Sequence, residues 1–339
     1  MNRRAVIGWA GGAALGVSAA VAPAAAQPLA VQAQQTVGTS SESIAAGATQ
    51  LRVLGDVGRG WRIDVEGAWG TRSRSGSDVF GTAYPYDDRV QIVDAFAEWT
   101  RPGGRGVRAV KAGRYRTPFG ISSAGDHAYL GFLRPPLIRY GGYYALSSGY
   151  LEHGAAVNLG APRASLEVSL GTPADVGTAR RRGEVSLVTR AEVAHGTVVV
   201  GASYLDTTPD QPARFAHGRA RFGGLDLRWM RGGVLLRGEW IAGRPFDGTA
   251  TRGGYADLVV HRPGLGPVTL LARAERLAYD ARAPFALYTH RYTAAARVRL
   301  WSTLALAAGL THQAGQSTQR RPTAIDVGLT YAVRQSLRP

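Results

Sequence analysis

Cysteine is missing from this 339-residue chain, lysine occurs only at position 111, and long apolar runs are confined to the N-terminus. Without cysteine the chain can form no disulfide, thiolate nucleophile, cysteine-ligated zinc site or iron–sulfur cluster. Past residue 26, no segment contains the roughly 18 consecutive apolar residues of a transmembrane helix. If the mature chain resides in a membrane, it must therefore cross it as a closed β-barrel.

Arginine and glycine, in contrast, are abundant. The chain has 40 basic residues against 24 acidic ones, a formal net charge of +16, and 45 glycines. Such a charge ordinarily favours nucleic acid or anionic surfaces as partners. Nearly all of it is arginine in a chain rich in alanine and glycine, which is typical of a genomic compositional bias, so the charge alone identifies no partner. Glycine lies well above its average share of ~7% and favours a turn-rich β-structure.

The first 26 residues have the pattern of a secretory signal peptide. Arg3 and Arg4 precede an apolar run at residues 5–21, and alanines at residues 24–26 precede Gln27. A basic start, a short apolar segment and small residues at the cleavage site direct export. The run is short and weakly apolar for the alternative, a membrane anchor. We expect residues 1–26 to be removed and residues 27–339 to form a single domain.

Most of the remaining sequence alternates with period two. In residues 61–69 and 325–333, apolar side chains alternate with polar or charged ones. Successive side chains of a strand point to opposite faces, so each such strand has one apolar and one polar face. Strands of about ten residues with this pattern are typical of a transmembrane antiparallel barrel, apolar toward lipid and polar toward the lumen. A soluble β-sandwich also alternates, but it does not normally need so many strands with charges on the second face.

The period predicts an all-β transmembrane antiparallel β-barrel with sixteen strands, and fourteen is the alternative. The expected strands cover residues 29–37, 49–57, 60–70, 89–100, 106–116, 150–160, 163–171, 184–193, 196–205, 218–230, 233–243, 253–262, 267–279, 288–300, 302–312 and 323–333. Tight turns and long loops alternate between them, as at the two ends of an outer-membrane barrel. Both chain ends lie at the short-turn side only if the strand number is even, which requires the weak segment at 29–37.

The alternation slips at one place, Gly223 and Gly224. Before them, Arg219 and Arg221 occupy odd positions, and after them Asp226 occupies an even position. If all charged side chains of this strand face the lumen, a β-bulge at the two glycines must restore the phase.

The strand at 106–116 ends in a distinctive junction. Residues 113–120 read GRYRTPFG. Thr117 and Pro118 end the strand because proline cannot donate to the ladder, and Gly120, after Phe119, lets the chain turn away from the wall. This segment resembles the strand-to-loop junction of the phosphate-selective porin O and P family and related outer-membrane diffusion porins.

The resemblance implies a sixteen-stranded barrel, commonly trimeric, with a long loop folded into the lumen. Here that loop would be residues 117–149. A loop of this length without regular structure is normally functional if it is ordered.

Selectivity in such a pore depends on the charges that face its lumen. The strand phases direct nearly equal numbers of arginines and acids inward, so we expect most of these arginines to be paired across strands. The inward arginines are Arg62, Arg108, Arg114, Arg116, Arg190, Arg219, Arg221, Arg228, Arg237, Arg273, Arg291, Arg297 and Arg299. The inward acids are Asp64, Glu66, Asp94, Glu98, Glu167, Glu184, Glu192, Asp226, Glu239, Asp257, Glu275 and Asp326.

Arginine is in local excess around the long loop, and these residues are the main candidates for anion selectivity. The planar guanidinium suits phosphate or carboxylate groups. An alternative for Arg134 and Arg139 is that they clamp the loop to wall carboxylates such as Asp94 or Glu98. The candidate pore-lining residues are Arg114, Arg116, Arg134, Arg139, Arg108, Arg62, Arg219 and Arg221.

Aromatic residues and the lone lysine complete the candidate sites. Tyr140, Tyr143 and Tyr144 either line the constriction or belong to an interfacial aromatic girdle, and Tyr150 and most tryptophans favour the girdle. The phase of its strand directs Lys111 toward lipid, where a charge near the midplane costs roughly 2–4 kcal/mol. Lys111 must therefore be covered by another subunit, lie near the interface, or belong to a different local register.

Catalytic signatures are weak. The chain has no G-x-S-x-G or H-E-x-x-H sequence, Walker loop or dinucleotide fingerprint. His127 beside Asp126, near Ser122 and Ser123, is the one local grouping that resembles a hydrolase triad. We expect the chain to have no enzymatic activity and to bind no metal or cofactor. A hydrolase at the barrel rim and a non-conducting structural or adhesive barrel are the alternatives.

The sequence therefore predicts an outer-membrane porin for passive diffusion of small hydrophilic solutes, with a mild preference for anions. The basic run at residues 180–182 falls in an expected extracellular loop, where lipopolysaccharide phosphates are better partners than nucleic acid. Outer-membrane lipid and, by the resemblance, a homotrimer are the other expected partners.

Overall fold

A computed structural model describes residues 29–73, 90–101, 105–121, 131–139, 151–173, 185–207, 219–244, 249–280, 287–315 and 322–336. The expected signal peptide lies outside these residues. The described part of the chain contains sixteen β-strands, two short 3-10 turns and no α-helix. Nothing helical within it is long and apolar enough to cross a membrane.

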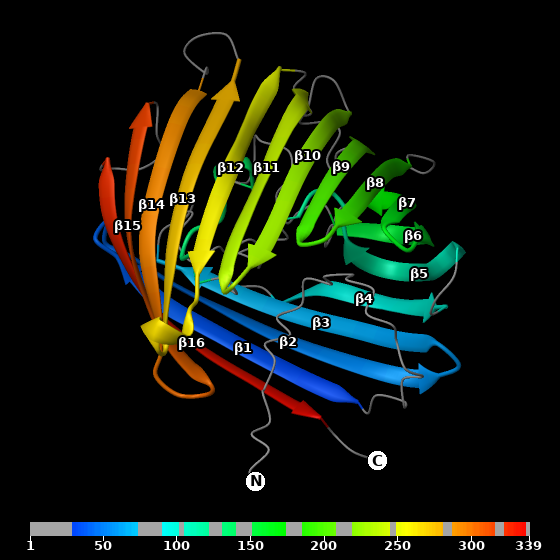
Figure 1. Ribbon diagram of the computed structural model, residues 1–339, viewed down its shortest axis with the longest axis horizontal. Helices are drawn as coiled ribbons and strands as arrows, with labels where there is room; N and C mark the ends of the chain where they lie inside the picture. Colours follow the sequence, from blue (N-terminus) through cyan, green and yellow to red (C-terminus); the bar gives the residue numbers. More distant parts are fainter. Residues whose placement is uncertain are drawn as a thin grey trace.

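The strands form one closed antiparallel barrel. They are β1 (Ala30–Ser40), β2 (Ile44–Gly58), β3 (Trp61–Arg72), β4 (Val90–Thr100), β5 (Gly106–Arg116), β6 (Leu151–Ala161), β7 (Ala164–Pro173), β8 (Ser186–His195), β9 (Val198–Thr207), β10 (Ala220–Arg231), β11 (Val234–Arg244), β12 (Thr251–Val260), β13 (Val268–Tyr279), β14 (Leu287–Arg299), β15 (Leu304–Gly315) and β16 (Thr323–Ser336). Each strand pairs with the next along the chain, and β16 pairs with β1, so the sheet has no free edge (Figure 1). The expectation of sixteen strands is confirmed, including the weak first one.

Alternation along the strands separates a polar inner face from an apolar outer face. In β3, Asp64 and Glu66 are buried, whereas Ile63 and Val65 are exposed. The same alternation runs through β16, where Asp326 is buried between exposed apolar neighbours. Exposed apolar side chains around charged buried ones are the reverse of the distribution in a soluble protein.

The connections differ between the two ends of the barrel. At one end, tight turns join β6 to β7, β8 to β9 and β10 to β11. Gly196 and Gly232 adopt a φ of 57° in two of these turns, a conformation that glycine tolerates without a Cβ clash. At the other end the connections are long, except for the short turn at residues 41–43 between β1 and β2. The expected alternation of short and long connections is thus present in β2 to β16.

A β-bulge in β5 changes the orientation of the only lysine. The β5–β6 ladder shifts its register between Val107 and Ala109, leaving Arg108 as the extra residue. The insertion inverts the phase of the residues directly after it. Lys111 therefore faces the lumen, and its ammonium lies 2.6 Å from the carboxylate of Glu167. Of the three alternatives for Lys111, the different local register is the one observed; the sequence period alone does not reveal where a bulge lies.

The bulge expected at Gly223 and Gly224 is absent. β10 pairs with β9 and β11 without a register shift. With an unbroken phase, Phe222 faces inward and is 1% exposed, whereas Arg221 faces outward. Arg219 and Arg221 both bind Asp206 on the outer face, so their inward placement was also wrong. The expectation assumed a polar inner face throughout, but part of that face is apolar and covered.

Candidate functional site

The junction after β5 carries the chain from the wall toward β9 and β10. Phe119 N–H donates to the Thr117 carbonyl at 2.8 Å, which makes a tight turn directly after the strand. Gly120 N–H then donates to the Ser203 hydroxyl on β9 at 3.1 Å. The Phe119 ring is 3% exposed and packs with Phe222 on the inner face of β10. The expected junction residues thus start a segment that crosses the barrel interior.

Residues 131–138 are buried against the inner faces of the later strands. Phe132 packs on Val259 of β12 and Leu271 of β13. The guanidinium of Arg273 lies 3.9 Å from the Phe132 ring centroid, a cation–π contact. Ile138 belongs to the same apolar cluster as Phe119. Both described parts of the long connection therefore cover the inner wall, as expected for a loop folded into the lumen.

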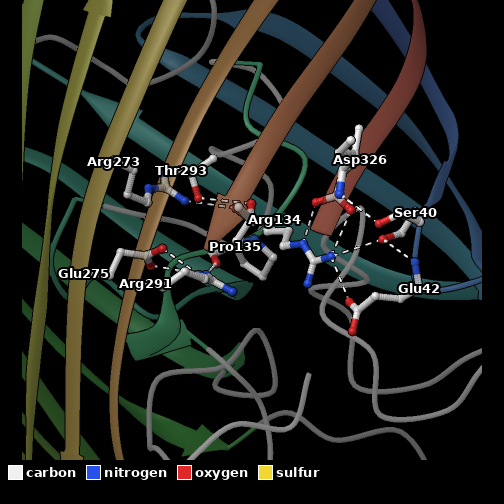
Figure 2. Close-up of polar contacts among 12 residues, drawn as sticks. Ser40, Glu42, Arg134, Pro135, Arg273, Glu275, Arg291, Thr293 and Asp326 are labelled. Atoms are coloured by element: carbon white, nitrogen blue, oxygen red, sulfur yellow. Dashed lines mark hydrogen bonds and ion pairs between the residues drawn. The ribbon is translucent and has the colours of Figure 1, made fainter. Parts of the chain in front are cut away.

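Backbone groups of this segment bind charged side chains of the wall (Figure 2). Arg273 donates to the Arg134 carbonyl at 2.9 Å, and Arg291 donates to the Pro135 carbonyl. Leu137 N–H donates to the Glu275 carboxylate at 2.8 Å. A hydrogen bond to a charged group contributes about 1.5–3 kcal/mol to stability, more than a neutral hydrogen bond does. Side chains of the wall thus bind the main chain of the loop.

The side chain of Arg134 points from the loop toward β16 and the β1–β2 turn (Figure 2). It donates to Asp326 at 2.5 and 2.8 Å, to Glu42 at 3.0 Å and to the Ser40 hydroxyl at 3.3 Å. At 3% exposure it has no surface to offer a passing solute. Its contacts are those of a loop clamp, although the carboxylates are not the Asp94 and Glu98 expected from sequence.

Beneath the loop, ion pairs connect neighbouring strands from β11 to β14. Asp257 lies between Arg237 at 3.0 Å and Arg273 at 2.6 Å. Glu275 binds Arg291 at 2.6 Å. All five side chains are less than one-tenth exposed. These inward arginines are therefore paired across strands, and they hold the wall and the loop together.

A second cluster lies on β2 to β5, where the long loop begins. Arg52 donates to Asp64 at 2.9 Å. Arg116, the last residue of β5, binds both Asp94 and Glu66. The three carboxylates are at most 5% exposed, whereas the Arg52 and Arg116 side chains are 27% and 23% exposed. In this cluster the positive groups reach the water of the lumen and the negative groups lie behind them.

A third cluster lies on β8 to β10. Arg190 binds Asp226 at 2.7 Å and Glu192 at 2.6 Å, and Arg228 also binds Glu192. Here the most exposed member is the carboxylate of Glu192, at 29%. The exposed excess of positive charge on β2 to β5 is therefore not repeated on this side.

Of the other candidate arginines, two face inward as expected and one does not. Arg62 binds Glu98 at 3.0 Å and is 49% exposed. Arg108, at the bulge, packs over Gly160 of β6. Arg114 faces outward beside His153, with the two side chains 3.5 Å apart. The bulge inverts the phase of Arg114 for the same reason that it turns Lys111 inward.

Two charged residues of the wall, Arg52 and Glu42, were not among those predicted from the sequence. Arg52 sits at an alternate position of the expected strand at 49–57, so strict use of the period would have found it. Glu42 lies in a turn, where periodicity carries no information, and its contact with Arg134 spans 92 positions of sequence.

Several candidates lie beyond the described residues. Tyr140, Tyr143 and Tyr144 are among them, as are Tyr150 and the grouping around His127. Arg139 ends the 3-10 turn Leu137–Arg139, and its side chain is not described. Within the described ranges, no group of three or more His, Cys, Asp or Glu side chains could hold a metal ion.

Comparisons with known proteins show similarity in structure only. No family model and no curated protein matches the chain. Among solved structures, the anion-selective porin from Comamonas acidovorans shares 13% identity at a TM-score of 0.59, with 90% of this chain and 98% of that chain covered. Salmonella typhi OmpF in complex with daunomycin shares 11% identity at a TM-score of 0.61, covering 90% and 97%. Pseudomonas putida OprB, at high pH, shares 8% at 0.62, covering 91% and 94%. At identities this low, the TM-scores establish a common fold and nothing more.

Proposed function

We propose that the chain forms a passive diffusion channel for small hydrophilic solutes in the bacterial outer membrane. The closed barrel with exposed apolar side chains outside and charges inside suits a lipid surrounding and an aqueous lumen. A sixteen-stranded barrel is wide enough to leave an aqueous passage, whereas about eight strands would be filled by side chains. The described parts of the segment that crosses the interior narrow this passage.

A mild preference for anions is the second part of the proposal. The observation that carries it is the exposure order on β2 to β5: Arg52, Arg116 and Arg62 are 27%, 23% and 49% exposed, while the carboxylates they bind are 0–12% exposed. A solute in the lumen therefore meets guanidinium groups first. A low-dielectric wall focuses their field into the passage, which favours phosphate or carboxylate solutes over cations.

Planar-bilayer recording of the purified chain tests both parts. We expect stepwise conductance and, in a salt gradient, a reversal potential that reports anion preference. Arg62→Gln, whose side chain is already half exposed, and the double variant Arg52→Gln with Arg116→Gln should shift the potential toward cation preference. Arg231→Gln, on the outer face of β10, is the control: it removes the same charge outside the lumen and should shift the potential little. Cation preference of the unmodified channel would refute the anion proposal.

Failure to conduct would refute the channel itself and favour a non-conducting structural barrel. Heat-modifiable mobility in electrophoresis must first establish that the protein tested is folded. A hydrolase at the rim would instead release product from ester or peptide substrates without conducting.

The location and assembly belong to the same proposal. Removal of residues 1–26, insertion into the outer membrane next to lipopolysaccharide, and a homotrimer are expected. N-terminal sequencing of the protein from isolated outer membranes should begin at Gln27, and native mass spectrometry should give the oligomer mass.

A further inference from the structure

The outer face of β10 to β14 carries a hollow among its apolar side chains. These five strands lie side by side in the barrel (Figure 1). The hollow has a volume of about 550 Å³, and its floor includes Gly238, Ala256 and Ala274. These three small residues pair directly across β11, β12 and β13, so no side chain fills the space above them. Trp240 and Tyr292 are among the larger side chains that line the hollow.

A second hollow of about 500 Å³ continues the first toward the short-turn end. The two share Ala256, Ala274 and Tyr292, and the second is bounded by Leu258 and Leu310. The combined groove is apolar and long, and its form suits a hydrocarbon chain lying along the strands.

Basic side chains border the groove toward the long-loop end. Arg276 and His290 line it directly and pair across β13 and β14. Arg252 of β12 lies one row further up, and Arg244 of β11 pairs with Arg221 of β10 in the row beyond. We call this set, Arg221, Arg244, Arg252, Arg276 and His290, the basic belt. Like charges directly opposite each other are unfavourable in a sheet, so an anion bound there would stabilise the belt.

Among the described residues, Arg221 is the one member of the belt that forms an ion pair with a protein carboxylate. Among outward-facing side chains of the described strands, Asp206 is the acidic one, and it binds Arg219 and Arg221. Asp280, just past β13, accepts a hydrogen bond from Tyr288 at 2.9 Å. Within the described ranges, Arg244 and Arg276 form no ion pair.

We propose that the belt and the groove together bind a phosphorylated lipid of the outer leaflet, of the lipid A type. The inference rests on the proposed outer-membrane location. Phosphate groups would lie against Arg252, Arg276 and His290, since guanidinium groups bind phosphate through paired hydrogen bonds. An acyl chain would occupy the groove below. The order of the two features matches such a lipid: charge toward the loops, hydrocarbon toward the middle of the barrel wall.

A second copy of the chain fits this face less well. Contact through the same face on both copies would place belt against belt. Contact through another face would require outward carboxylates, and the described strands present none apart from Asp206, which is already bound. Charge complementarity thus favours the lipid.

Native mass spectrometry of the full-length protein in detergent tests the inference. The probes are diphosphoryl lipid A and the same lipid after removal of its phosphates. We expect saturable binding of the first and at least tenfold weaker binding of the second. Arg252→Gln with Arg276→Gln should weaken lipid A binding about tenfold, and Ala274→Trp should do so by filling the groove. Arg231→Gln, outward on β10 at the short-turn end, is the matched control and should bind as the unmodified protein does.

Equal binding of both lipids, or unchanged binding by the double variant, would overturn the inference. A single Ala274→Cys substitution adds an independent test because the chain has no other cysteine. Disulfide-linked dimers formed through that position in membranes would show that another copy occupies the groove. Conductance of the same preparations separates the two proposals: a conducting channel indifferent to lipid phosphate refutes this inference alone, and loss of all conductance refutes the channel.

Discussion

Gly224 faces the lumen directly beneath the ring of Phe119. A Cβ at this position would lie 2.8 Å from the ring, whereas a Cβ at the neighbouring Gly223, on the outer face, meets nothing within 4 Å. Gly224→Val should therefore lower the free energy of unfolding by about 1–3 kcal/mol, the usual cost of overpacking, and Gly223→Val should change it little. Thermal unfolding followed by circular dichroism measures both. Equal effects of the two substitutions would mean that Phe119 does not pack there.

Arg134 makes the most concentrated set of polar contacts between the loop and the wall. Arg134→Ala leaves Asp326 and Glu42 buried without their cation, which costs about 3–5 kcal/mol. We expect a lower unfolding temperature and larger, noisier single-channel conductance, because the clamp also holds the loop in the lumen.

A triple variant separates these two effects. Adding Asp326→Asn and Glu42→Gln to Arg134→Ala removes the unpaired charges, so stability should recover in part while the altered conductance persists. Recovery of both would show that the clamp stabilises the wall and does not hold the loop.

Single residues also mark the limit of what the sequence predicts about the site. Strand phase correctly predicted that Arg273 and Arg291 face inward. Their pairing was also predictable, because each binds an acid on a directly adjacent strand. The partners of Arg134 come from a turn and from the last strand, and no local pattern encodes a contact over that separation.

At the scale of one strand, the bulge in β5 reverses the expected effect of Lys111→Met on stability. If Lys111 faced lipid, Lys111→Met would stabilise the protein by removing a charge that costs roughly 2–4 kcal/mol at the midplane. Because Lys111 faces inward and binds Glu167 at 2.6 Å, the substitution should instead destabilise it. A double-mutant cycle with Glu167→Gln, followed by denaturant unfolding, measures the sign and the coupling. A stabilised single variant would refute the bulge.

The strands themselves were largely predictable because alternation over about ten residues is a strong signal. Two elements show why phase is harder than position. In β5 an extra residue at Arg108 inverts the phase of Lys111 and Arg114 without disturbing the local alternation, whereas Arg116 at the end of the strand still binds the inward carboxylates of Asp94 and Glu66. In β10, Phe222 faces inward because the long connection covers that part of the wall, so the rule of a polar lumen does not hold there.

Across the whole molecule, the loop divides the lumen into two kinds of wall. Beneath the loop, on β11 to β14, arginines such as Arg273 are buried and bind the loop as well as wall acids. On β2 to β5 the arginines reach water while their carboxylates stay buried. Overall charge balance therefore says little about selectivity, which depends on which sign is exposed along the open side.

That asymmetry makes selectivity depend on salt. Exposed guanidinium groups act on a solute through water, where the Debye length falls from about 10 Å at 0.1 M to about 3 Å at 1 M ionic strength. With the same concentration ratio across the bilayer, the reversal potential should report strong anion preference at low absolute salt and almost none at molar salt. Arg62→Gln should reduce the low-salt value and leave the high-salt value unchanged, because only the screened field is altered. A reversal potential independent of absolute salt would instead assign the preference to direct binding or to pore size.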